Sequence, residues 1–176
     1  MQNIKDFIII KDNFFEEKVY KEILFDISRL KFQNKSTVDN GRDNKNDYQK
    51  IYFIVPLNQN HFAVEETQKN IEEILDAKIN ILESNYFLST KHIEASPHFD
   101  ASQINCLIYL KGLELMNSGT GFYKKEKDKF IPNLNVGFKE NRAIIFDSKI
   151  HHASLQFNEG CASRYVMANF IDYKEE

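Results

Sequence analysis

Short apolar runs separated by turn-forming residues fill the sequence from Ile79 to Asp172. Runs of this length and spacing are typical of the strands of a β-sandwich or barrel. The fifteen Phe and eight Tyr favour the same structure, since large rings pack well on pleated sheets. We therefore predict an all-β C-terminal core, with strands at 79–82, 85–89, 103–110, 121–123, 143–146 and 165–171.

Residues 1–78 predict a different structure, because apolar residues recur there at helical spacing. Asn13 would cap the first helix, and Glu16 would close a capping box. The expected elements are a buried strand at 7–10, helices at 14–31 and 62–77, a strand at 51–57 and a polar loop at 33–50. We interpret that loop as a surface connection; the alternative is a lid over a site.

The predicted fold class is α+β, mostly β. A length of 176 residues fits one domain. Within residues 1–176, the N-terminal strand, helices and polar loop would occupy 1–78, and the β core would occupy 79–176.

Charge and cysteine content exclude several classes of protein. The net charge of −3 lacks the footprint of a nucleic-acid-binding protein. Cys106 and Cys161 form neither a disulfide framework nor a zinc motif, which favours reduced thiols in a cytoplasmic protein. The run Phe7–Ile10 is too short for a signal core or a membrane span. The run 124–129 mixes both charge signs and predicts a solvated hairpin.

Candidate metal ligands occur in the predicted β core. On a strand, His98 and Asp100 would point to the same face and offer an imidazole beside a carboxylate. A second imidazole from the pair 151–152 would complete a facial triad of the non-haem iron type. Arg164, on the last predicted strand, could bind a carboxylate bidentately. Taken separately, each of these signals also fits a purely structural role.

The ordered set His98-Phe99-Asp100, then His152, then Arg164 resembles the signature of the Fe(II)- and 2-oxoglutarate-dependent oxygenases. Small uncharacterised bacterial and phage members of the prolyl-hydroxylase-like group are similar over about residues 85–172. The similar segments are 97–100, 108–110, 119–123 and 141–146. The resemblance implies a double-stranded β-helix, a jelly-roll or cupin-like core, with two N-terminal helices packed on one sheet.

The resemblance also assigns roles to individual residues. His98, Asp100 and His152 match the iron ligands, and His151 is interpreted as a neighbour. Arg164 matches the residue that binds the distal carboxylate of 2-oxoglutarate.

Many relatives place Ser or Thr two residues after that arginine, where this chain has Val166. Tyr109 is the candidate for the missing hydrogen bond; the alternative is a core tyrosine. Asn105, on the same predicted face, could point to substrate or co-substrate. The segment 119–121 is interpreted as a turn without a phosphate-binding role.

The implied activity is that of a dioxygenase with Fe(II) as metal and 2-oxoglutarate as co-substrate. Oxidative decarboxylation would yield succinate and carbon dioxide while dioxygen oxidises a substrate C–H bond. Asp100 favours hydroxylation or another plain oxidation over halogenation, since related halogenases lack the carboxylate. The substrate would be a small molecule or a protein side chain, with no membrane or nucleic acid as partner. The alternative is a non-catalytic metal-binding or structural β-helix module, which would not need Arg164 and Tyr109 to face the metal.

Overall fold

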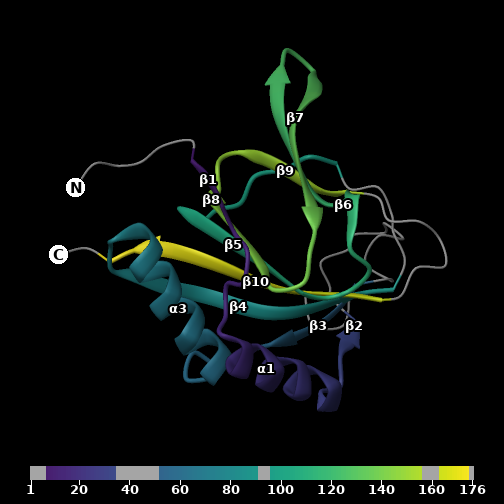
Figure 1. Ribbon diagram of the computed structural model, residues 1–176. Coiled ribbons are helices and arrows are strands. Elements are labelled where there is room, and N and C mark those ends of the chain that lie inside the picture. Colours follow the sequence, from purple (N-terminus) through teal and green to yellow (C-terminus); the bar gives the residue numbers. More distant parts are fainter. Residues whose placement is uncertain (1–6, 35–51, 91–95, 156–162, 175–176) are drawn as a thin grey trace.

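Two antiparallel β-sheets and two helices make up the described part of the chain, which comprises residues 7–34, 52–90, 96–155 and 163–174 of a computed structural model (Figure 1). The strands of the larger sheet are β1 (Ile8–Lys11), β2 (Gln33–Asn34), β3 (Tyr52–Pro56), β4 (Ile79–Ser89), β5 (Ile104–Lys111), β8 (Arg142–Asp147) and β10 (Arg164–Tyr173). The smaller sheet comprises β6 (Leu115–Glu126), β7 (Lys129–Phe138) and β9 (His151–Leu155). The helices are α1 (Glu17–Arg29) and α3 (Phe62–Leu75).

The strand order places the C-terminal strand at the centre of the larger sheet. That order is β1-β8-β5-β10-β4-β3-β2, so β10 lies between β5 and β4. The smaller sheet has the order β7-β6-β9. Buried side chains from both sheets, including Tyr109 on β5 and Phe122 on β6, form one hydrophobic cluster. The two sheets therefore face each other with side chains packed between them.

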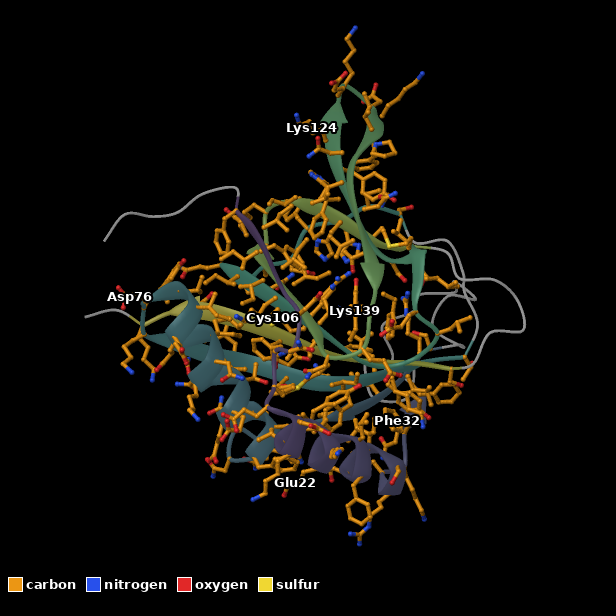
Figure 2. The ribbon with its side chains drawn as sticks, viewed as in Figure 1. Glu22, Phe32, Asp76, Cys106, Lys124 and Lys139 are labelled. Atoms are coloured by element: carbon orange, nitrogen blue, oxygen red, sulfur yellow. The ribbon has the colours of Figure 1, made fainter. Side chains whose placement is uncertain are left out.

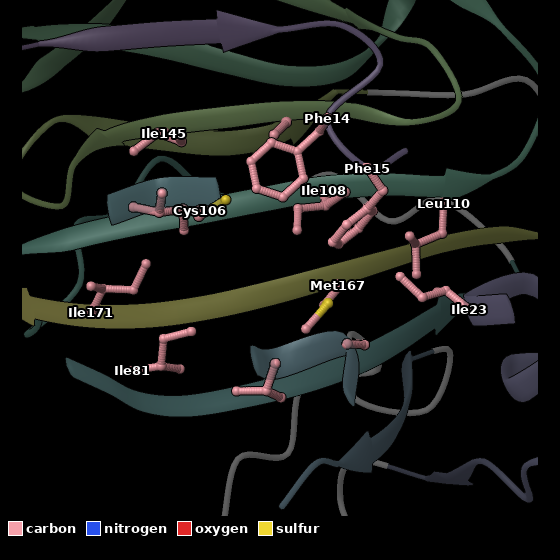
Figure 3. Close-up of a cluster of buried hydrophobic side chains, with 14 of the residues drawn as sticks. Phe14, Phe15, Ile23, Ile81, Cys106, Ile108, Leu110, Ile145, Met167 and Ile171 are labelled. Carbon is pink, nitrogen blue, oxygen red and sulfur yellow. The ribbon is translucent and has the colours of Figure 1, made fainter. Parts of the chain in front are cut away.

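Both helices cover the other face of the larger sheet. Ile23 and Ile27 of α1 and Ile71 of α3 are buried in the main hydrophobic cluster. The same cluster contains Cys106 of β5 and Met167 of β10 (Figure 3). The apolar face of each helix thus packs against the sheet, as the helical spacing predicts.

The first helix begins later than predicted. Asn13 has a φ of 52° and is not the N-cap; that position is taken by Glu16, whose side chain makes no capping hydrogen bond. The reason lies far along the chain. The amide of Asn141 accepts a hydrogen bond from the Phe15 N–H at 3.0 Å and donates one to the Phe15 carbonyl at 2.9 Å. Phe14 and Phe15 are thereby held in the core ahead of the helix.

Several strand boundaries also differ from the prediction. The expected strands at 79–82 and 85–89 are one strand, β4, because buried Ser84 hydrogen-bonds to Asn169 of β10 at 2.8 Å. The segment 119–121 lies within β6 and is not a turn. Strands β2, β7 and β9 were not predicted, and β1 is only partly buried.

The hairpin prediction for 124–129 is confirmed, since these residues join β6 to β7 and are exposed. The hairpin extends away from the rest of the molecule, with Lys124 near its end (Figure 2). None of the helices in the described residues is long and apolar enough to cross a membrane.

Candidate metal centre

Three predicted ligands lie together between the two sheets. One potential ligand atom from each of His98, Asp100 and His152 lies within 4.8 Å of the other two. His98 is not on a regular strand as predicted; it forms an isolated β-bridge with His152 of β9. The two residues exchange backbone hydrogen bonds, with His98 N–H to the His152 carbonyl at 3.1 Å and the reverse bond at 2.8 Å. This pairing, and not strand alternation, brings the imidazoles side by side.

Backbone carbonyls set the orientation of both imidazoles. Nδ1 of His98 lies 3.2 Å from the Ser96 carbonyl, and Nδ1 of His152 lies 3.0 Å from the Ile150 carbonyl. A carbonyl can only accept, so Nδ1 carries the proton in each neutral ring. Nε2 is then the atom with a free lone pair, which is the arrangement that metal-binding histidines require.

Three neighbours fix the position of Asp100, one through its backbone and two through its carboxylate. The backbone N–H of Asp100 donates to the Ser148 carbonyl at 3.0 Å, and its Oδ2 lies 3.3 Å from Nε2 of His152. The side chain of Asn105 donates to the same Oδ2. Burial raises the pKa of Asp100, whereas the hydrogen bond and charge of a protonated His152, the Asn105 hydrogen bond and the charge of a protonated His98 together lower it below its ordinary value. The group is therefore a carboxylate at neutral pH.

A cavity of about 420 Å³ extends from these three side chains. Its walls include Asn105, Leu107 and Tyr109 of β5, which confirms that these three alternating residues share a face. Arg164, the first residue of β10, also lines the cavity and is buried. The cavity thus connects the candidate ligands with the predicted carboxylate-binding residues.

Two further hydroxyl groups lie beside Arg164 and Tyr109. The guanidinium of Arg164 donates to the Ser154 hydroxyl, and the Tyr109 hydroxyl lies 2.7 Å from that of Thr120. Burial raises the pKa of Tyr109 to about 12, so its hydroxyl is protonated and can donate at neutral pH. The Phe138 ring contacts both groups. Its centroid lies 4.6 Å from that of the stacked Tyr109 ring and 5.8 Å from the guanidinium carbon of Arg164.

Sequence reasoning missed Thr120 and Ser154 as cavity residues. Thr120 was hidden by its two glycines, which indicated a turn. In the structure Gly119 has a φ of 129°, and a Cβ there would lie 2.1 Å from the Val136 carbonyl oxygen. The glycine therefore allows close approach of β7. Ser154 had one usable signal: it lies two residues after His152, so alternation on a strand would have placed both on one face.

His151 and His152 face opposite sides of β9. His152 is buried and lines the cavity, whereas His151 does not line it and contacts Phe99 and Phe130. His152, the residue predicted as ligand, thus lies on the cavity side of β9, and His151, interpreted as a neighbour, lies on the other side. His92, Cys161 and nearly all of the 33–50 loop lie outside the described residues.

Comparison with known proteins gives a match in structure only. No protein-family model and no curated protein matches the chain. Solved structures with similar folds include those of 2-oxoglutarate-dependent enzymes, which confirms at the level of the fold the resemblance predicted from the sequence.

Three of these structures illustrate the match. The non-haem α-ketoglutarate-dependent epimerase SnoN of nogalamycin biosynthesis has a TM-score of 0.68 and 8% identity, covering 95% of this chain and 78% of its own. HygX from Streptomyces hygroscopicus, solved with nickel and 2-oxoglutarate bound, has a TM-score of 0.62 and 11% identity, covering 93% and 82%. A Pseudomonas putida prolyl-4-hydroxylase has a TM-score of 0.57 and 10% identity, covering 96% and 92%. Identities this low establish a shared fold and not a shared reaction.

Proposed function

We propose that this protein is an Fe(II)- and 2-oxoglutarate-dependent dioxygenase that hydroxylates a small molecule or a protein side chain. The observation that carries the proposal is the cluster of two imidazoles and one carboxylate on a cavity that also contains a buried arginine. The proposal includes a double-stranded β-helix for the two facing sheets, within a single domain. It also includes a cytoplasmic location, on the sequence argument from the cysteines.

The donor set fits iron. Two imidazoles with Nδ1 on carbonyls and one ionised carboxylate would bind Fe(II) on one side and leave its other positions open. In this proposal the ligands are His98, Asp100 and His152. The bound metal would supply the activation of dioxygen and the chelation of the co-substrate.

Arg164 and Tyr109 would bind 2-oxoglutarate. Its distal carboxylate would be buried in the cavity, and a buried carboxylate needs a charged partner and hydrogen-bond donors. The Arg164 guanidinium provides the charge, and the protonated Tyr109 hydroxyl provides a donor. Thr120 and Ser154 are in place to orient these two groups, since each already contacts one of them. This arrangement would replace the hydroxyl that Val166 lacks.

Asn105 would act on the metal side of the cavity. Its amide donates to Asp100 and accepts from Ser102 at 2.8 Å, so both ends are engaged. We assign it the role of holding the Asp100 carboxylate, and the side of the residue that lines the cavity would contact co-substrate or substrate.

The net reaction would combine a substrate C–H, 2-oxoglutarate and dioxygen to give the C–OH product, succinate and carbon dioxide. One oxygen atom enters the product and the other enters succinate. The apolar walls contributed by Leu107, Val166 and Ala168 would exclude water from the reacting groups.

The test is succinate formation from 2-oxoglutarate with Fe(II) and dioxygen, with and without metabolite and peptide libraries. The wild-type protein should form succinate, and His152→Ala should not. His151→Ala is the matched control, because it removes an imidazole one residue away that does not line the cavity. Absence of succinate from wild type, together with intact metal binding, would favour a non-catalytic metal-binding module instead.

A further inference from the structure

An exposed group of rings lies on the outer side of β9, opposite the candidate metal centre. We call Phe99, His151 and Phe130 the outer aromatic cluster. The ring centroid of His151 lies 5.5 Å from that of Phe99 and 5.1 Å from that of Phe130. Phe99 is 57% exposed and Phe130 is 37% exposed, so water contacts rings that would gain from burial.

The cluster adjoins the proposed active site through the chain itself. Phe99 lies between His98 and Asp100 in sequence, and His151 precedes His152. His98 is exposed whereas His152 is buried, so the centre opens to solvent on the side of His98. A molecule bound on the cluster would therefore lie beside the entrance.

The hairpin of β6 and β7 extends away from the body (Figure 1), and Phe130 of the cluster lies on its strand β7. Residues 129–135 of β7 are all exposed. Phe130 pairs with Lys125 on the outer face of the hairpin, whereas the exposed Ile131 and Leu134 lie on its other face, where Leu134 pairs with Phe122. A two-stranded hairpin by itself is only marginally stable in water. Neighbouring exposed rings on such an element are a feature of interaction surfaces.

Lysines surround this apolar surface. Lys125 Nζ lies 5.9 Å from the centroid of the Phe130 ring. Lys149 Nζ lies 5.7 Å from the centroid of the Phe99 ring and donates to the Asp100 carbonyl at 3.1 Å. The run 124–129 contains four lysines and two acidic residues, whereas the whole chain has a net charge of −3. The surface is thus locally basic on an acidic protein.

We infer that the outer aromatic cluster and the adjoining hairpin bind an acidic polypeptide segment that carries apolar side chains, and that the substrate is a protein. This inference deepens the proposed function, because it selects between the two substrate classes. The cluster lies outside the cavity that would hold the co-substrate, so a substrate bound on the cluster would extend well beyond its reacting group. Apolar contacts would supply affinity, and the lysines would select acidic neighbours.

Two other occupants fit the surface less well. Nucleic acid binding relies on many cationic contacts to phosphates, and the net charge of the chain opposes it. A second copy of this chain in a two-fold contact would bring the lysines of one hairpin against those of the other.

The test is fluorescence anisotropy with fluorescein-labelled peptides, in the absence of metal and 2-oxoglutarate. The probe is Glu-Phe-Ser repeated four times; the comparison peptides carry Lys in place of Glu, or Ala in place of Phe. We expect the probe to bind at least about tenfold more tightly than either comparison peptide, as expected when rings and charge both contribute. Phe130→Ala and Lys125→Glu should each weaken it by about tenfold.

Phe25→Ala is the matched control, since Phe25 is 62% exposed with Arg29 at 5.3 Å from its ring, but lies on α1. Four results would each overturn the inference. The three peptides bind equally, or Phe25→Ala weakens probe binding as much as Phe130→Ala does. Alternatively, a labelled oligo-dT binds more tightly than the probe, or self-association of the protein competes with the probe. Succinate formation is measured separately. A protein that forms succinate but does not discriminate the peptides refutes the docking surface alone, and the converse refutes the proposed reaction alone.

Discussion

Removing the hydroxyl of Tyr109 separates a role in co-substrate binding from a role in the core. In the structure this hydroxyl lies 2.7 Å from that of Thr120, and both residues are buried and line the cavity. Loss of one buried hydrogen bond costs roughly 0.5–1.5 kcal/mol. For a chain of this length, 1 kcal/mol corresponds to a fall in melting temperature of about 2–4 °C. Tyr109→Phe should therefore fold, with slightly lower stability.

The effect on 2-oxoglutarate is expected to be larger. A hydrogen bond to a charged acceptor contributes up to about 3 kcal/mol, which corresponds to roughly a hundredfold change in the dissociation constant. Titration of 2-oxoglutarate into metal-loaded Tyr109→Phe should show a weakening of a few-fold to a hundredfold, with metal affinity unchanged. Thr120→Val combined with Tyr109→Phe should recover the lost stability, because both partners are then replaced by apolar groups. It should not recover the affinity.

Tyr20→Phe is the matched control for this experiment. The Tyr20 hydroxyl donates to the Leu110 carbonyl on the helix side of the large sheet, and Tyr20 does not line the cavity. Its removal should lower the melting temperature and leave 2-oxoglutarate affinity unaltered. If Tyr109→Phe behaves in the same way as Tyr20→Phe, Tyr109 is a core residue and its assignment to the site is wrong.

Three further predictions concern the metal, a salt bridge and a buried amide. His152→Ala should abolish Mn²⁺ binding measured by calorimetry and His151→Ala should retain it, so equal losses would refute the ligand assignment. Hydrogen bonds from Arg142 and Lys139 hold the pKa of Asp12 well below its ordinary value. These bonds therefore stabilise the folded protein fully above about pH 4, and the stabilisation is lost as the pH falls through the lower pKa of the folded state. Asp12→Asn should thus lower the free energy of unfolding at pH 7 by about 1 kcal/mol or less, as the carboxylate is 36% exposed, and the deficit should vanish in acid urea titrations. Asn141→Ala should cost about 2–3 kcal/mol in chemical denaturation, from two buried hydrogen bonds and a φ of 57°, and Asn141→Gly should cost less because glycine adopts that φ freely.

Hydrophobic periodicity was sufficient to predict both helices and most strands of the larger sheet. Those elements bury an apolar face, and the spacing of apolar residues reports that face directly. Strands β7 and β9 were not predicted, because their residues are polar or exposed over much of their length. They are strands because neighbouring chain segments pair with them, and a pattern of apolar residues contains no information on that pairing.

The remaining errors have the same physical origin in contacts between distant residues. The sequence predicted a break between 82 and 85, but the Ser84 hydroxyl donates a hydrogen bond to Asn169 on the neighbouring strand, so β4 continues. Asn13 indicated a helix cap, but Asn141 binds the backbone of Phe15 and delays the helix. The partner of the Ser84 hydroxyl lies 85 residues away, and the side chain that binds the Phe15 backbone lies 126 residues away, so neither contact can be inferred from the local sequence.

The candidate site illustrates why a short motif predicted the position of side chains better than secondary structure did. His98 and His152 are neighbours because their backbones exchange two hydrogen bonds, and Asp100 is fixed by its backbone bond to the Ser148 carbonyl. These contacts require only main-chain atoms, so most surrounding side chains can change without moving the three candidate ligands. Solved structures with 8–13% identity accordingly retain the fold over more than 90% of this chain. Only the few residues whose side chains could bind a metal or a carboxylate can then be recognised in the sequence. That is why His98, Asp100, His152 and Arg164 could be singled out, while Thr120, which lies between two glycines that indicated a turn, could not.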